Sequence, residues 1–129
     1  MTFRRRTFVH LAAGAAALPA VPCVAQAQAY PSRTARIVVG FPPGGATDIQ
    51  ARLMGEWLTE RLGQQFIIEN KPGASGNIGT DTVAKAPADG YTLLQVATPA
   101  AINAALYSNL PFDFKRDIAP IVYVARLAY

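Results

Sequence analysis

The stretch that most constrains the fold is Phe41–Asp48, FPPGGATD, because it separates two different periodic patterns. The apolar run Ile37–Phe41 before it is typical of a buried strand, and the helical pattern Asp48–Leu62 follows it. Its two prolines end the strand, and its two glycines allow a tight turn with exposed backbone. Thr47-x-x-Gln50 has the pattern of a capping box, which predicts the helix start. Since a helix start offers free N–H groups and a positive dipole end, the stretch predicts an anion-binding turn.

The rest of the chain alternates between strand and helix patterns. Further strands are expected at 65–70, 91–97 and 118–125, helical segments at 77–86 and 100–106, and a loop at 109–115. This alternation predicts an α/β fold, with a mostly parallel sheet and helices on both of its faces. Trp57, which lies in the helical apolar pattern, is expected in the core.

Three loops follow the carboxyl ends of the first three expected strands, and ligands bind at such ends in open α/β sheets. They are Phe41–Asp48, the glycine-rich Asn70–Gly79, and Ala97–Ala101. None contains arginine, and Lys71 stands at the edge of the second. An anion here would be held by backbone N–H groups, hydroxyls, water and helix dipoles.

Each loop also has a purely structural interpretation. Gly44-Gly45 can serve as a tight turn alone, and Asp48 is expected to assist the helix start rather than to contact a ligand. Gly73-x-x-Gly76-x-x-Gly79 lacks the Gly-Lys-Ser/Thr of a P-loop and follows the second strand, so it does not predict a nucleotide site.

The N-terminus has the pattern of an export signal. Arg4–Arg6 is a positive segment, the mostly apolar 8–24 follows, and two A-x-A sites predict cleavage after Ala27 or Ala29. We therefore interpret 1–29 as a signal peptide. Arg5-Arg6-Thr7-Phe8-Val9 resembles a twin-arginine signal, with a Sec signal as the alternative. Pro22 fits poorly beside Cys23 in a lipobox.

Composition after residue 29 favours binding over chemistry. The whole chain carries 12 basic and 8 acidic residues, so removing Arg4, Arg5 and Arg6 leaves 9 against 8, a net charge of +1. No Lys/Arg cluster remains, which argues against nucleic-acid binding. The single histidine and single cysteine, His10 and Cys23, leave with the signal. The common catalytic triads, thiol chemistry, disulfides and metal-ligand spacings are therefore absent from the mature sequence.

Several motifs occur together in an order that resembles a known family. They are Tyr30-Pro31-Ser32, Ile37-Val38-Val39, Phe41–Asp48, Glu69–Gly79 (ENKPGASGNIG), Ala88–Leu93 (ADGYTL), Leu110–Asp113 (LPFD) and Asp117–Ile121 (DIAPI). Nearly all of Tyr30–Tyr129 is similar to the N-terminal part of the Bug-type solute receptors. These are periplasmic substrate-binding proteins of tripartite tricarboxylate transporters.

The resemblance implies a fold and a function. It implies part of the first lobe of a two-lobed, type II-like periplasmic binding protein, which captures a small carboxylate for membrane transporter subunits, without cofactor or metal. Phe41 would lie against the ligand's carbon skeleton. The residues implied to surround the carboxylate are Gly45, Ala46 and Thr47 from the first loop, Ser75, Gly76 and Asn77 from the second, and Thr98 from the third. Ser75 stands where the family commonly has glycine.

The family's proteins are much longer than this chain, so we expect 30–129 to be an incomplete N-terminal part of the lobe, from a fragment or a truncated gene product. Two other interpretations stay open. One is a secreted α/β enzyme, hydrolase-like, with catalytic residues beyond residue 129; the other is a fragment without function. The missing histidine and cysteine favour the receptor, which is not an enzyme. The sequence does not say which carboxylate is bound.

Overall fold

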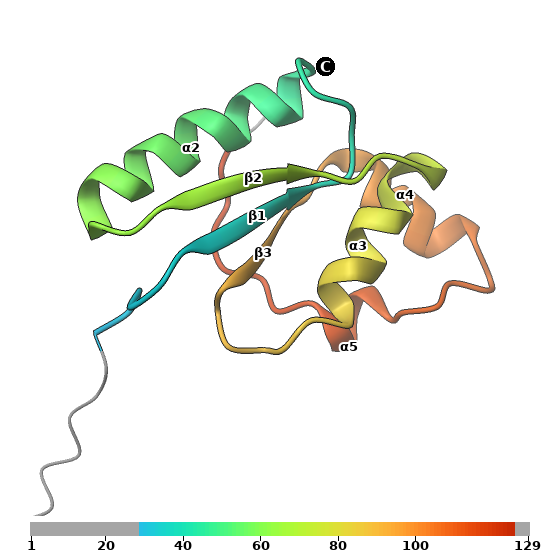
Figure 1. Cartoon of the computed structure of the whole chain (residues 1–129). Helices are drawn as coiled ribbons and strands as arrows, with labels where there is room; N and C mark the ends of the chain where they lie inside the picture. Colours follow the sequence, from blue (N-terminus) through green and yellow to red (C-terminus); the bar gives the residue numbers. More distant parts are fainter. Residues whose placement is uncertain (1–28, 126–129) are drawn as a thin grey trace, which may run out of the picture.

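The computed structural model describes residues 29–125, so the predicted signal peptide lies outside the described residues except for Ala29. The elements, in chain order, are β1 (Ala35–Val39), α2 (Ala46–Leu62), β2 (Phe66–Asn70), the short 3₁₀ turn η1 (Ala74–Gly76), α3 (Asn77–Ala84), β3 (Thr92–Gln95), α4 (Thr98–Leu106) and α5 (Phe114–Asp117) (Figure 1). No helix in this part of the chain is long and apolar enough to cross a membrane.

The three strands form one parallel sheet in the order β2-β1-β3 (Figure 1). The central strand carries the apolar run Ile37–Val39, in which each residue exposes at most 1% of its surface. Helices cover both faces of a parallel sheet of this kind, so a continuous apolar run suits its central strand. The predicted α/β class and parallel sheet are confirmed.

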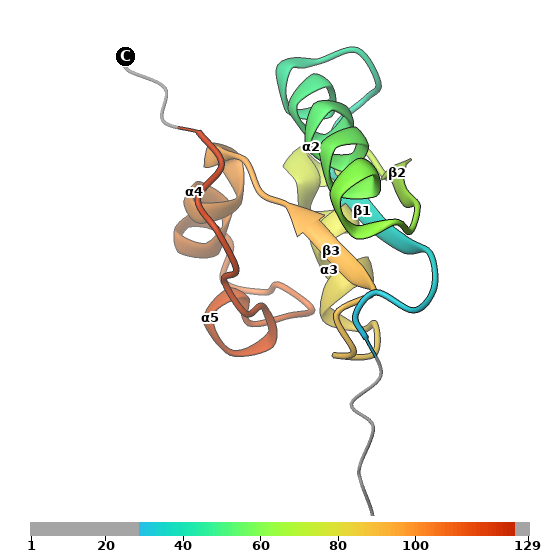
Figure 2. The same ribbon diagram turned by 90° about the vertical axis from the view of Figure 1, so that its left-hand side faces the viewer.

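Helices cover both faces of the sheet. α2 packs on β1 and β2, whereas α3 packs on β3 and β1. The chain crosses the sheet in opposite directions in its two β-α-β connections, and right-handed connections then place the two helices on opposite faces. Figure 2 shows α2 in front of the strands and α3 behind them. The core beneath α2 consists of Ala35, Ile37, Val39, Ala51 and Phe66.

The prediction that Trp57 is a core residue is wrong. Its exposed fraction is 54%, and Leu53 and Ile49, one and two turns before it, are 63% and 51% exposed. α2 instead rests on the sheet through a face that includes Ala51 and Gly55. A Cβ at Gly55 would lie 3.0 Å from Ile68 Cδ1 and 3.2 Å from the Phe66 carbonyl oxygen, so the helix lies unusually close to β2.

The C-terminal part departs from the sequence prediction in two ways. Residues 118–125 form no strand, because a strand requires a neighbour to pair with, and none of the described segments pairs with them. The segment also contains Pro120, which cannot donate to a ladder. The expected loop at 109–115 contains the start of α5, where Asp113 Oδ1 accepts hydrogen bonds from the backbone N–H groups of Lys115 and Arg116 at 2.9 and 3.1 Å.

Candidate functional site

The three predicted loops emerge at the same edge of the sheet. Val39, the last residue of β1, is paired in register with Asn70 at the end of β2 and with Gln95 at the end of β3. Because all three strands run parallel, their carboxyl ends are level, as Figure 1 shows. This edge matches the place where open α/β sheets bind ligands.

The first loop ends in an uncapped helix start. α2 begins at Ala46 with Gly45 as its N-cap, and no side chain caps it. The predicted capping box is therefore wrong, since Thr47 is the second helical residue. The first intrahelical bond runs from the Ile49 N–H to the Gly45 carbonyl at 2.9 Å. The N–H groups of Ala46, Thr47 and Asp48 precede that bond, and helix starts leave such groups available for a ligand.

Asp48 binds the first loop, β2 and Arg52 of its own helix, and it does not cap the start of α2. Its side chain is only 2% exposed. Oδ2 accepts from the Gly44 N–H at 2.9 Å and from Arg52 Nε at 2.9 Å. Oδ1 accepts from Arg52 Nη2 at 3.1 Å and from Asn70 Nδ2 at 2.8 Å. Asn70 Nδ2 also donates to the Phe41 carbonyl, and Asn70 Oδ1 accepts from Arg52 Nη2, both at 3.1 Å.

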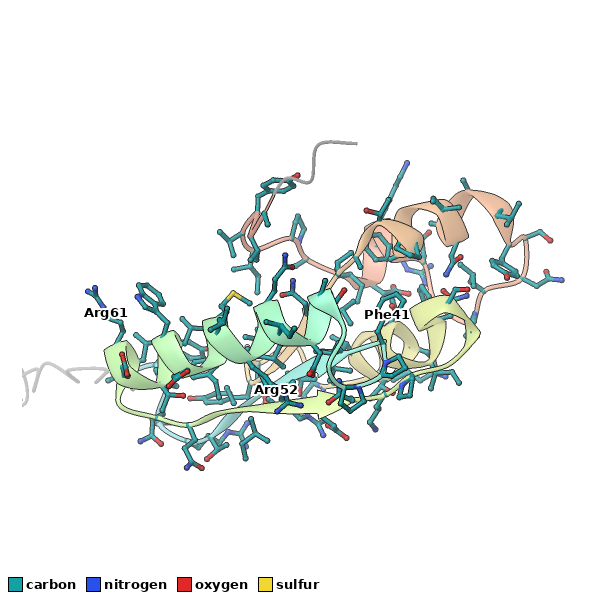
Figure 3. The ribbon with its side chains drawn as sticks, turned by 90° about the horizontal axis from the view of Figure 1, so that it is seen from above. Phe41, Arg52 and Arg61 are labelled. Carbon is teal, nitrogen blue, oxygen red and sulfur yellow. The ribbon has the colours of Figure 1, made fainter. Side chains whose placement is uncertain are left out.

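This cluster, Asp48–Arg52–Asn70, joins the first loop to the end of β2. Figure 3 shows Arg52 between α2 and β2, and Phe41 close to α3. Hydrogen bonds from Arg52, then Gly44 and Asn70, hold the pKa of the Asp48 carboxyl far below its usual range. With four donors on two oxygens, Asp48 has little capacity left for a ligand, and its charge opposes a second carboxylate. The contacts support a structural role for Asp48, through the loop and not through helix capping.

Sequence reasoning missed Arg52 and Asn70. Arg52 follows Asp48 by four residues, which is the spacing of an ion pair on one helix face. This spacing could have predicted the contact between the two side chains. In Figure 3 Arg61 lies at the far end of the same helix, and its guanidinium is 5.2 Å from the Trp57 ring centroid. No local pattern marks Asn70, because its partners come from the preceding loop and helix.

The second loop has a left-handed backbone. Four consecutive residues have positive φ: Gly73 (134°), Ala74 (47°), Ser75 (55°) and Gly76 (92°). For alanine and serine this conformation costs roughly 1–2 kcal/mol each, so other contacts must hold it. One such contact is the Phe41 ring, since a Cβ at Gly76 would lie 3.5 Å from Cε2 and Cζ of that ring. Asn77 follows as the first residue of α3.

The third loop leads into α4, with Thr98 as the first helical residue. One turn later Asn103 is 5% exposed and reaches back to the second loop. Its Nδ2 donates to the Ser75 carbonyl at 3.0 Å and to Asn77 Oδ1 at 2.9 Å. The sequence prediction did not include Asn103.

The structure thus brings together part of the predicted site set. Phe41 contacts Gly76, and Ser75 and Asn77 share the partner Asn103. Gly45, Ala46, Thr47 and Thr98 lie at helix starts on the same edge, and no described hydrogen bond joins Gly45–Thr47 to the second loop. Two surface hollows lie away from these loops, one over α2 and β2 and one between α4 and α5.

A parallel α/β lobe whose helix starts gather at one sheet edge is the architecture of a ligand-binding lobe. The family model of the tripartite tricarboxylate transporter family receptor matches residues 50–129, which is more than half of the chain. The chain therefore belongs to this family, a family of periplasmic solute-binding receptors, and the resemblance inferred from the motifs is confirmed.

Curated relatives agree with this assignment. Protein BugT of Bordetella pertussis is 42% identical over 100 residues, which cover 76% of this chain and 31% of BugT. A UPF0065 protein from the tcbD–tcbE intergenic region of Pseudomonas sp. strain P51 is 43% identical over 99 residues, covering 77% of this chain and 30% of that protein. The chain thus spans about 30% of the length of these relatives.

Solved structures resemble the described fold. MatC from Rhodopseudomonas palustris with bound malate is 34% identical, with a TM-score of 0.65, and the match covers 74% of this chain and 33% of MatC. R. palustris Rpa4515 with adipate is 44% identical, with a TM-score of 0.60, covering 65% and 28% of the two chains. The segment corresponds to part of a lobe of such a binding protein, as predicted.

Proposed function

We propose that residues 30–129 supply the first-lobe part of a periplasmic receptor that captures a small carboxylate for a tripartite tricarboxylate-type transporter. The observation that carries the proposal is the alignment of three loops at one sheet edge, each opening a helix. The relatives with bound malate and adipate favour a dicarboxylate as the ligand.

The loops have suitable chemistry for one carboxylate group. The uncapped N–H groups at the start of α2 and the positive ends of α2 and α3 attract an anion. Ser75 and Asn77 add a hydroxyl and an amide, and Thr98 adds a hydroxyl at the start of α4. Phe41 offers an apolar surface to the carbon chain of the ligand. None of these groups is basic, so binding relies on dipoles and hydrogen bonds.

The proposal includes export and the absence of catalysis. Residues 1–29 act as a signal peptide that is removed near Ala27 or Ala29, and 30–129 form the N-terminal part of the lobe. The exported protein is purified from the periplasm and its mass is measured. We expect the mass of a chain that begins at residue 28 or 30. Retention of Cys23 with an attached lipid would contradict this. The sequence after residue 29 has no histidine or cysteine, which favours a receptor over the hydrolase-like alternative.

The binding site is tested with Gly45→Val in the complete receptor that carries residues 30–129. If the natural reading frame does not encode the second lobe, residues 30–129 are joined to the remaining part of Rpa4515 to give a complete receptor. Gly45 has φ −78° and ψ 165°, which valine adopts readily, and a Cβ there meets nothing closer than the Pro42 oxygen at 3.7 Å. The variant should therefore fold, while its side chain crowds the helix start.

Calorimetric titration with malate and adipate is the measurement. Loss of one or two hydrogen bonds to a charged ligand, at about 1.5–3 kcal/mol each, predicts an affinity at least roughly tenfold weaker. Ala88→Val, in the exposed turn before β3 at the opposite sheet edge, is the control and should bind normally. Wild-type affinity in a folded Gly45→Val protein would place the site elsewhere. Failure of the wild-type receptor to bind either acid would contradict the proposed ligand class.

A further inference from the structure

Asn103 is a buried side chain outside the predicted site set, 5% exposed, and it hydrogen-bonds to two members of that set. It lies on α4, 26 residues after Asn77 and 28 after Ser75, and it donates to both. It therefore connects the third loop's helix to the second loop, whose left-handed residues require support.

The chemistry of these contacts fixes two amide orientations. The Ser75 backbone carbonyl can only accept a hydrogen bond, so the Asn103 atom 3.0 Å from it must be Nδ2. The second hydrogen on that nitrogen then donates to the atom of Asn77 at 2.9 Å, which must be its oxygen, Oδ1. With Oδ1 turned toward Asn103, the Nδ2 group of Asn77 points away from Asn103. Among residues 29–125 that Nδ2 donates to no other group.

We propose that Asn103 is a positioning residue that orients the side-chain amide of Asn77, so that its N–H₂ group faces the ligand carboxylate. The proposal rests on the proposed function and deepens it. It names the residue that makes the second loop present a hydrogen-bond donor to the ligand carboxylate. Without Asn103, the Asn77 amide can turn by 180° at little cost and present its oxygen, which repels a carboxylate.

Asn77→Asp in the complete receptor tests the orientation directly. Aspartate has the same shape, and one of its oxygens still accepts from Asn103, so the melting temperature should stay close to that of wild type. Its other oxygen replaces the donor that faces the ligand. We expect the affinity for adipate to fall about 100-fold, as for a lost hydrogen bond to a charged group together with charge repulsion.

Asn103→Asp tests the positioning step and separates it from simple loss of structure. An aspartate at 103 cannot donate, so the Asn77 amide should turn its N–H₂ toward residue 103 and its oxygen toward the ligand. Adipate binding should weaken more than binding of adipamide, whose ends are neutral amides that can donate. We expect the adipate-to-adipamide affinity ratio to fall at least tenfold. A structural defect alone would weaken both ligands alike and leave the ratio unchanged, which would overturn the proposal.

Asn109→Asp is the matched control, because Asn109 is exposed beyond the end of α4 and the substitution changes charge by the same amount. It should bind adipate as wild type does. A second readout needs no ligand: the side-chain amide protons of Asn103 should exchange with solvent more slowly than those of Asn109. Equal exchange rates, or wild-type adipate affinity in folded Asn77→Asp, would overturn the positioning role. If wild type binds neither malate nor adipate but the exchange rates differ, the proposed function fails while the Asn103–Asn77 contact stands.

Discussion

At the scale of single residues, Asp48 explains how the first loop keeps one conformation. A buried carboxylate is costly unless its oxygens are paired, and here four donors pair them. Two of those donors come from outside α2: the Gly44 N–H from the loop and Asn70 from β2. Asp48 therefore fixes the loop relative to the sheet, which keeps the uncapped start of α2 in place.

The lowered pKa of Asp48 makes stability depend on pH. Because the folded pKa lies below the unfolded value of about 4, the folded state is favoured by ionised Asp48 at higher pH. This contribution is present above pH ~4 and is lost as the pH falls toward the folded pKa. In Asp48→Asn it is absent at every pH. We expect the wild-type melting temperature to fall more steeply between about pH 5 and pH 3 than that of Asp48→Asn. Parallel melting curves over that range would show that the carboxylate does not carry this stability.

Residue types predicted the positions of the candidate loops better than they predicted the contacts that support those loops. Gly45, Ser75 and Asn77 follow strand ends, and local chain order is enough to place them in loops. The supporting contacts of Asn70 and Asn103 depend on which segments meet in space. An asparagine on a helix is ordinary in sequence, and only the sheet order brings α4 to the second loop.

At the scale of elements, α3 and β1 approach each other through glycines. A Cβ at Gly79 would lie 2.9 Å from Gly40 Cα and 3.3 Å from both the Gly40 nitrogen and the Lys71 carbonyl oxygen. A Cβ at Gly40 would lie 2.8 Å from Gly76 Cα. These neighbours are backbone atoms, which cannot move without shifting the helix or the strand. The close approach places the start of α3 directly against the end of β1.

Gly79→Ala should therefore destabilise the fold, although alanine favours helices. Overpacking against fixed backbone costs typically about 1–3 kcal/mol, which exceeds the gain of about 1 kcal/mol in helix propensity. Urea unfolding should give a lower midpoint for Gly79→Ala with an unchanged slope. Gly45→Ala is the control, since its Cβ meets nothing within 3.7 Å, and it should unfold close to wild type. A Gly79→Ala protein as stable as wild type would mean that α3 moves freely on β1.

Hydrophobic periodicity predicted the first three strands and the three helices between and after them, with ends shifted by a few residues. It failed where an element depends on its neighbours. The apolar run 118–125 has strand character but no partner within the described chain. The helical pattern of α2 was correct, but Trp57 lies outside the face that contacts the sheet, where the small residues Ala51 and Gly55 allow close packing.

At the scale of the whole molecule, large apolar side chains are exposed on several elements, among them α2 and the segment after α5. Ile49, Leu53 and Trp57 form a stripe along α2, and Ile121–Val124 follow α5, with exposed fractions from 44% to 76%. In addition, β2 and β3 each have one edge that no described strand pairs. Exposed apolar stripes and open sheet edges promote association between chains. Since the chain spans about 30% of its relatives' length, we expect later segments of a complete receptor to cover such surfaces.

We therefore predict that a protein consisting of residues 30–129 alone associates with itself at micromolar concentration, and that Leu53→Gln weakens this association. Replacing an exposed leucine removes apolar area from the stripe. Each Å² of apolar surface buried between chains stabilises the association by about 25 cal/mol. In the complete receptor the same substitution should lower the melting temperature, because there the leucine is covered. Sedimentation velocity of the short protein and thermal melting of the complete one measure the two effects. A monomeric short protein that melts cooperatively, or a complete receptor indifferent to Leu53→Gln, would mean that the α2 stripe is a true solvent-facing surface.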